Sequence, residues 1–204
     1  MGYPIIRSIP GALNHRCTLW ALLAIPAYPL IIELIFDDQH YPELMHTTGT
    51  FSAQLLVIAL AITPLQRVAK RWKQLIRPTR WLVSRRRHIG VASFVYALAH
   101  TVLYLLEMDD LYEVWIKAFD FELLIGWLGF LGLLMLAVTS NSISVNALGK
   151  YWKRLQRLAY PIAAFVFLHW YIFDPFFNEV LYWFMPLLGL QIFRLTDRFV
   201  MKSM

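Results

Sequence analysis

Long apolar segments recur along this chain, and they constrain its fold more than any other feature. They lie at about 17–36, 51–66, 89–107, 123–139, 158–173 and 180–193, separated by charged or turn-forming residues. A membrane-spanning helix needs about 20 mostly apolar residues. The segments are continuously apolar and lack the alternation of barrel strands, so each one is expected to be a helix.

The amino-acid composition also indicates a membrane protein. Apolar residues make up 59% and charged residues 16% of the 204 residues, whereas soluble domains average roughly 45–50% apolar and 25% charged residues. Six spans with short connections use nearly the whole chain and leave no room for a soluble catalytic domain. We therefore expect an all-α, integral membrane six-helix bundle that forms a single domain over residues 1–204.

The positive charges predict the orientation of this bundle. Of the 19 lysine and arginine residues, all but Lys117 fall in the two terminal segments, the 67–88 loop or the 140–157 loop. Positive charge concentrates on the cytoplasmic side of membrane proteins, so both termini and these two loops are predicted to be cytoplasmic. The net charge of +6 is then a consequence of topology. It attracts anionic lipid and does not indicate nucleic-acid binding.

Two of the apolar segments contain a histidine. His100 lies in the third segment, seven residues before Glu107, and His169 lies in the fifth, five residues before Asp174. At a rise of about 1.5 Å per residue, both imidazoles are expected roughly 8–10 Å inside the outer boundary, on helices that run in the same direction. An ionisable side chain at such depth is costly and indicates a functional site.

Two interpretations fit this pair of histidines. Neutral imidazole is a common axial ligand of haem iron, and helix bundles build cofactor sites from facing side chains, so His100 and His169 could bind one iron. Aromatic residues of the same two segments could wall the macrocycle. Alternatively, each imidazole only hydrogen-bonds a main-chain carbonyl or a hydroxyl group of a neighbouring helix.

The sequence around these histidines resembles a known family. The similar runs are HTTGTFSAQLLVIALAITPLQRVAK at 46–70, RRRHIGVASFVYALAHTVLYLLE at 85–107 and LGKYWKRLQRLAYPIAAFVFLHWYIF at 148–173. They look like the MsrQ (YedZ) family, the haem-binding membrane subunits of the bacterial periplasmic methionine sulfoxide reductase system. That family lies within the ferric-reductase-like transmembrane superfamily. The resemblance covers the second to fifth apolar segments.

The resemblance implies a six-helix bundle with b-type haem, and with His100 and His169 at the positions of the axial ligands to the haem iron. One haem is expected, with two as the alternative, because the family's further ligand position falls on Gln156, and glutamine is not a usual haem ligand. His88 could serve an inner haem, and His46 could ligate iron or contact a propionate. For His88 and His46, a solvated histidine at the membrane boundary is the competing interpretation.

The resemblance further implies an electron-transfer subunit rather than a catalytic subunit, in the bacterial inner membrane with multiple passes. Electrons would come from the quinol pool or from a cytoplasmic flavin reductase, with FMN or a quinone as a further cofactor. They would pass to a periplasmic molybdopterin-containing catalytic subunit. Two alternatives stay open: a stand-alone ferric-reductase-like carrier for metal or oxygen, and a haem-free transporter or scaffold. The chain contains no glycine-rich nucleotide loop, CxxC or HExxH motif that would support other chemistry.

Overall fold

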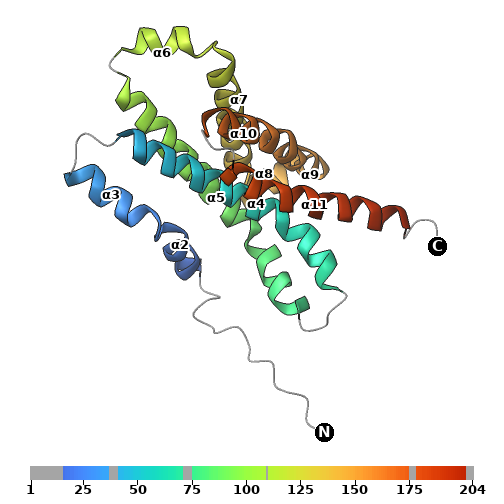
Figure 1. The fold of residues 1–204 in the computed structure, drawn as a ribbon. Helices are drawn as coiled ribbons and strands as arrows, with labels where there is room; N and C mark the ends of the chain where they lie inside the picture. The colour runs from blue at the N-terminus through green and yellow to red at the C-terminus, as the bar shows by residue number, and fades with distance from the viewer. Residues whose placement is uncertain (1–15, 37–40, 71–74, 109, 175–177, 201–204) are drawn as a thin grey trace. The chain divides into compact units, whose positions relative to one another are not determined.

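The structure, a computed structural model, consists of helices and their connections, with no strand in the part of the chain that it describes (Figure 1). It describes residues 16–36, 41–70, 75–108, 110–174 and 178–200, with the main chain alone at 16, 33, 34 and 197–200. The all-α prediction is confirmed for these residues. Two compact units divide the chain, Met1–His40 and Tyr41–Met204. A single domain over 1–204 stays a prediction.

The first apolar segment is broken into two helices. The sequence predicts one helix over 17–36, whereas the structure has α2 (Arg16–Ala24) and α3 (Ala27–Phe36), joined by a turn at Ile25 and Pro26. Proline has no main-chain N–H group, and its ring clashes with the preceding helical turn. Pro26 therefore explains why the predicted helix is interrupted.

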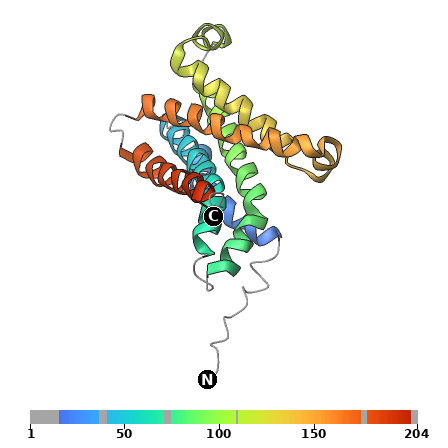
Figure 2. The ribbon, with the colours of Figure 1, turned by 90° about the vertical axis from the view of Figure 1, so that its right-hand side faces the viewer.

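Among the described residues of the second unit, three helices are long and apolar enough to cross a membrane: α4 (Tyr41–Ala69), α5 (Ile76–Glu107) and α7 (Phe121–Val138). Two more helices, α10 (Ala159–Phe173) and α11 (Asn178–Val200), pack against them. Helix α4 lies along α5 and α11, and α7 lies along α10 and also contacts α5 (Figures 1 and 2). The count of six spans and the cytoplasmic termini stay predictions.

Two helices extend well beyond the apolar segments that predict them. Segment 51–66 lies inside α4, which begins at Tyr41, and segment 89–107 lies inside α5, which begins at Ile76. Helix hydrogen bonds continue through charged residues, so hydropathy marks the apolar stretch and not the helix ends. Segments 123–139 and 158–173 match α7 and α10 within two residues, and segment 180–193 lies inside the longer α11.

Helix α4 contains a proline without being interrupted. Pro64 is buried within α4 and has no N–H group to donate to the carbonyl oxygen of Leu60, one turn earlier. The side chain of Gln191 on α11 donates to that oxygen instead, through Nε2 at 3.2 Å. A neighbouring helix thus satisfies the carbonyl that the proline frees, which is how membrane bundles tolerate proline.

Helices α7 and α10 approach each other closely because glycines line their contact. A Cβ atom added at Gly132 would lie 2.5 Å from Cγ1 of Ile162, and one added at Gly129 would lie 3.4 Å from Cγ2 of Val166. Small residues at helix contacts let the main chains pack closely in a membrane. Gly126, Gly129 and Gly132 follow one another at intervals of three residues, so the contact continues up to Gly126.

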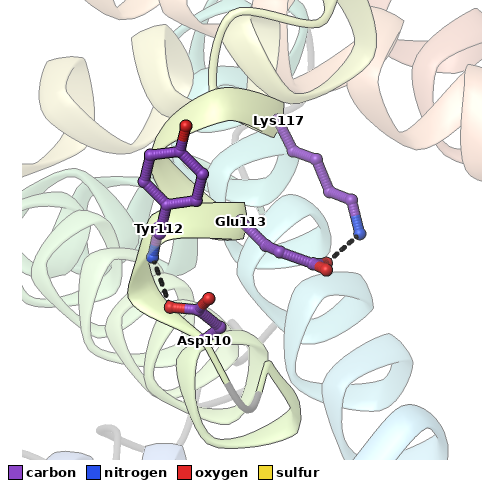
Figure 3. Close-up of polar contacts among 4 residues, drawn as sticks. All are labelled: Asp110, Tyr112, Glu113 and Lys117. Carbon is purple, nitrogen blue, oxygen red and sulfur yellow. Dashed lines mark hydrogen bonds and ion pairs between the residues drawn. The ribbon is translucent and has the colours of Figure 1, made fainter.

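A short helix, α6 (Leu111–Lys117), connects α5 to α7. It begins at an N-cap, where the carboxylate of Asp110 accepts a hydrogen bond of 2.8 Å from the main-chain N–H of Tyr112. Glu113 and Lys117 lie one turn apart and form an ion pair of 2.8 Å (Figure 3). The hydrogen bond and the charge of Glu113 raise the pKa of Lys117. Both side chains are exposed, so the pair adds little to stability.

The connection from α7 to α10 contains α8 (Ser142–Leu148), α9 (Lys150–Leu155) and the 3-10 turn η2 (Gln156–Leu158). Two side chains tie it to the C-terminal end of α7. Nε1 of Trp152 donates to the carbonyl oxygen of Thr139 at 2.9 Å, and the amide of Gln156 donates to the carbonyl oxygen of Leu136 and to the hydroxyl of Thr139, both at 3.4 Å. These bonds help to satisfy carbonyls that have no partner within the helix.

Candidate cofactor site

A cavity of about 600 Å³ lies between α4, α5, α7 and α10, a size typical of small-molecule sites. Its walls are mostly apolar, and His100 from α5 and His169 from α10 both line it. Glu107, at the end of α5, and Glu122, at the start of α7, line it as well. The cavity therefore lies near the ends of the helices that are predicted to face outward.

The imidazole rings of His100 and His169 lie close to each other in this cavity. Their centroids are 6.2 Å apart and their planes are at 84°. A metal ion bound by both rings, with bonds of about 2 Å and with each ring nitrogen roughly 1 Å from its ring centre, requires a centroid separation of about 6 Å. The observed separation leaves room for one metal ion between the rings.

Each imidazole is oriented by the main chain of a neighbouring helix. Nδ1 of His100 donates to the carbonyl oxygen of Met45 on α4 at 2.8 Å, and Nδ1 of His169 donates to that of Glu122 on α7 at 3.0 Å. Because a carbonyl oxygen only accepts, Nδ1 carries the proton in both rings and Nε2 keeps its lone pair. Such a bond commonly fixes the orientation and the tautomer of a metal-ligating histidine.

A glycine lies behind each imidazole. A Cβ atom added at Gly49 would lie 2.9 Å from Nδ1 of His100, and one added at Gly126 would lie 2.7 Å from Cε1 of His169. Each glycine comes one helical turn after the carbonyl that accepts from the same ring. The two halves of the site therefore repeat one arrangement: a glycine admits the ring, and the carbonyl of the previous turn orients it.

Three side chains that line the cavity have a buried polar atom without a hydrogen-bond partner among the described residues: Oγ1 of Thr50, Oη of Tyr104 and Nε1 of Trp170. Leaving a buried donor or acceptor unpaired costs about 1–3 kcal/mol. These atoms thus favour a ligand with polar groups of its own. Aromatic rings complete the walls, with Trp127 6.5 Å from Tyr104 and 6.1 Å from Phe130 between ring centroids.

The donor set restricts the kind of metal group that fits. Within the described ranges, no cluster of three or more His, Cys, Asp or Glu side chains could hold a bare metal ion. A site with two imidazole ligands suits a metal whose remaining ligands belong to a cofactor that binds together with it. Haem iron meets this condition, since the porphyrin supplies the equatorial ligands and imidazoles are common axial ligands. The propionate groups of haem would also suit the unpaired polar atoms.

Comparison with known proteins identifies the family of this chain. The family model described as "Ferric reductase like transmembrane component" matches residues 48–168, more than half of the chain. The chain belongs to the ferric-reductase-like transmembrane family. No solved structure matches it.

Two relatives come from Xanthomonas axonopodis pv. citri (strain 306) and Xanthomonas campestris pv. campestris (strain B100). Each is 34% identical over 135 residues, which is 63% of this chain and 57% of the relative. The chain thus matches somewhat more than half the length of these relatives. Both are named "Protein-methionine-sulfoxide reductase heme-binding subunit MsrQ". The resemblance to the MsrQ (YedZ) family that the sequence predicts is therefore confirmed.

The remaining predicted site residues of this ferric-reductase-like chain lie apart from the two rings, with one exception. His46 on α4 has an exposed side chain and lines the same cavity. His88 lies twelve residues before His100 on α5, about 18 Å along the helix axis. Gln156 bonds the end of α7. Neither His88 nor Gln156 lines the cavity, and their part in a second haem site stays a prediction.

The histidine positions alone do not reveal the two glycines and the two carbonyl groups that orient the rings. The three-residue spacing of Gly126, Gly129 and Gly132 in an apolar helix is a signal for a close helix contact and could have identified one of the two glycines. The carbonyl acceptors have no comparable signal, since every residue carries a carbonyl group.

Proposed function

We propose that this chain binds b-type haem between His100 and His169 and carries electrons across the bacterial inner membrane to a periplasmic methionine sulfoxide reductase subunit. The observation that carries the proposal is the pair of rings 6.2 Å apart, each oriented through Nδ1 by a main-chain carbonyl. The ferric-reductase-like family and the relatives named heme-binding subunits support it. We infer one haem per chain, since the cavity holds one such pair of rings.

The residues of the chain hold the group and set its properties. When bound, haem supplies a reversible one-electron iron couple. The lone pairs on Nε2 of His100 and His169 are the ligands. The carbonyl bonds at Nδ1 make both rings stronger electron donors, which stabilises ferric iron and lowers the reduction potential. The apolar and aromatic walls exclude water and so act on the potential in the opposite direction, because they disfavour the more highly charged iron.

The position of the site supports an acceptor on the outer side. His100 lies seven residues before the end of α5, and His169 lies four residues before the end of α10. The proposed acceptor is a molybdopterin-containing catalytic subunit that reduces protein methionine sulfoxide. The proposed donor is the quinol pool or a cytoplasmic flavin reductase, with quinone or FMN as the intermediate carrier. In the proposed topology, with six spans and cytoplasmic termini, the basic loops lie on the cytoplasmic side, which is also the side of the proposed flavin reductase.

The visible spectrum of the full chain, purified in detergent, tests the haem. We expect a Soret band that shifts on dithionite reduction and a pyridine haemochrome count of one haem per chain. His100→Ala and His169→Ala are each expected to lose most of the haem. His88→Ala, on the same helix as His100 but outside the cavity, serves as the matched control and keeps it. A parent protein without Soret absorption would instead support a haem-free transporter or scaffold.

The acceptor needs a separate experiment. The reduced protein is mixed with a periplasmic molybdopterin-containing methionine sulfoxide reductase subunit. Reoxidation of the haem is then followed at the Soret band after addition of a protein that contains methionine sulfoxide. Haem reoxidation that requires both the subunit and the protein with methionine sulfoxide supports the proposed partner. Reoxidation by ferric chelates or oxygen, without any effect of the subunit, would favour the stand-alone carrier.

A further inference from the structure

A second polar cluster lies at the opposite end of the bundle, where α4, α5, α10 and α11 meet. Nη1 of Arg194 on α11 donates to the hydroxyl of Tyr160 on α10 and, at 3.3 Å, to Oε1 of Gln191. Its guanidinium carbon lies 5.9 Å from the centroid of the Tyr160 ring. Nη1 of Arg86 on α5 donates to the hydroxyl of Thr63 on α4 at 3.3 Å.

None of the described side chains around the two arginines neutralises their charges. Arg86 lies close enough to Arg194 and Tyr160 to interact with both electrostatically. Among the described residues, every hydrogen-bond acceptor of the two guanidinium groups is neutral, and neither group forms an ion pair with a carboxylate. Both side chains are half-buried, and Nε of Arg194 is buried without a hydrogen-bond partner. Two positive charges close together in partly dehydrated surroundings cost free energy, so the cluster favours the binding of an anion.

Hydrogen bonds to neighbouring helices position the side chains of the cluster. Gln191, which accepts from Arg194, donates through its own amide to the carbonyl oxygen of Leu60 on α4. Tyr160 holds the same guanidinium from α10. Arginine presents its N–H donors as a planar fork that matches the oxygen atoms of a phosphate group. The guanidinium N–H groups of Arg86 and Arg194 that do not bond Thr63, Tyr160 or Gln191 are available to bind such a phosphate group.

We propose that Arg86 and Arg194 form a specific site for the phosphodiester group of an anionic phospholipid. The surroundings favour a lipid over a soluble phosphate, because exposed apolar side chains lie close to both arginines along their helices and can contact acyl chains: Val83, about one turn before Arg86 on α5, and Leu195, next to Arg194 on α11. The arginines also belong to the basic end of the bundle, predicted to be cytoplasmic, where basic pockets between membrane helices bind anionic headgroups. The proposal does not depend on haem binding at the other end.

Thermal unfolding of the delipidated full chain in detergent tests the proposal. Phosphatidylglycerol is expected to raise the unfolding midpoint of the parent protein by a few degrees, whereas phosphatidylcholine and inorganic phosphate at equal concentration do not. Arg86→Gln and Arg194→Gln each abolish most of this rise. Arg80→Gln, an exposed position on α5, removes the same charge and keeps the rise. Arg86→Lys keeps part of it and remains informative if a glutamine variant fails to fold.

Native mass spectrometry gives a second readout that does not depend on stability. The parent and Arg80→Gln proteins are expected to retain one phosphatidylglycerol per chain, and Arg194→Gln is expected to retain none. The Soret band of all these variants should match that of the parent, which separates this proposal from the haem proposal.

Three outcomes would overturn the lipid site. An equal rise with inorganic phosphate would assign the cluster to a soluble anion. An equal loss in Arg80→Gln would mean that only the general surface charge attracts lipid. Asp197 follows Arg194 by three residues in the sequence. If phosphatidylglycerol gives no rise and Asp197→Asn destabilises the parent protein, the chain itself supplies the counter-charge.

Discussion

Gly49 and His100 are so close that a Cβ atom on the glycine would lie 2.9 Å from Nδ1 of the imidazole. Gly126 stands in the same relation to His169, with 2.7 Å to Cε1. Van der Waals contact needs about 3.5 Å between such atoms, so any side chain at either glycine must displace the ring. Because the same ring carries the proposed ligand atom Nε2, each glycine helps to set the position of that atom through its contact with the ring.

Gly49→Ala and Gly126→Ala are therefore expected to lower the haem affinity about tenfold or more, the range that loss of an outer-shell support typically costs. The measurement is the haem content per chain, from the pyridine haemochrome, at limiting haem. Gly90→Ala on α5 is the matched control, since a Cβ atom there would meet nothing within 4 Å. Equal haem content in all three variants would show that the rings move aside without cost.

The two interpretations of the histidines that the sequence leaves open turn out to be compatible. The Nδ1 atoms of His100 and His169 bond main-chain carbonyls of neighbouring helices, as the structural interpretation expects. The same bonds leave Nε2 with a lone pair, as a ligand requires. Sequence spacing predicts the shared depth of the two rings because both helices rise by the same amount per residue. It cannot predict which carbonyl orients each ring, since that depends on how the helices pack.

His46→Ala is expected to leave one haem per chain, because the proposed iron ligands are the rings of His100 and His169. His46 lines the cavity from α4, but its side chain is exposed. The check is the haemochrome count together with the position of the Soret band in the oxidised and reduced forms. Loss of more than half of the haem would place His46 among the iron ligands and would remove His100 or His169 from that role.

Gln156→Ala is expected to lower the free energy of unfolding by about 1 kcal/mol, the usual value of a neutral hydrogen bond, without changing the haem content. The amide of Gln156 bonds the C-terminal end of α7, and the residue does not line the cavity. Trp152→Phe removes a bond to Thr139 at the same junction and serves as the comparison. Haem loss in Gln156→Ala alone would contradict this role and indicate a second haem site.

Gly132→Ala is expected to destabilise the contact between α7 and α10 by about 1–3 kcal/mol, the usual cost of an overpacked contact. A Cβ atom at Gly132 would meet Cγ1 of Ile162 at 2.5 Å. Ile162→Ala removes that atom, so the double variant should regain stability relative to the sum of the two single variants. Unfolding midpoints of the four proteins give this coupling directly. If the destabilisations of the two single variants simply add up in the double variant, α7 and α10 move apart to make room for the new Cβ atom.

The apolar segments predict where the central helices lie, but not how far they extend or whether they are continuous. Charged residues continue α5 from Ile76 up to the apolar stretch without interrupting its hydrogen bonds. Pro26 interrupts the first segment, whereas Pro64 lies inside an unbroken helix. The local sequence does not distinguish these two prolines. At Pro64, the side chain of Gln191, more than a hundred residues later in the sequence, bonds the carbonyl that the proline frees.

This relation gives the last prediction, which concerns Gln191 and Pro64. Gln191→Met keeps the length of the side chain but removes the donor to the carbonyl oxygen of Leu60. An unpaired buried carbonyl costs about 1–3 kcal/mol, so the variant should unfold at a lower temperature. Pro64→Ala restores a main-chain N–H at the position that normally bonds this carbonyl, so it should reduce the effect of Gln191→Met.

A double-mutant cycle of the parent, the two single variants and the double variant, followed by thermal unfolding in detergent, measures this coupling. Gln191 also accepts from Arg194, and that contact is lost in both backgrounds, so it cancels from the coupling term. A coupling close to zero would mean that the freed carbonyl finds another partner. If Gln191→Met destabilises the protein less when Pro64→Ala is also present, α11 stabilises α4 at its proline. A distant side chain then replaces the hydrogen bond that the helix itself cannot make.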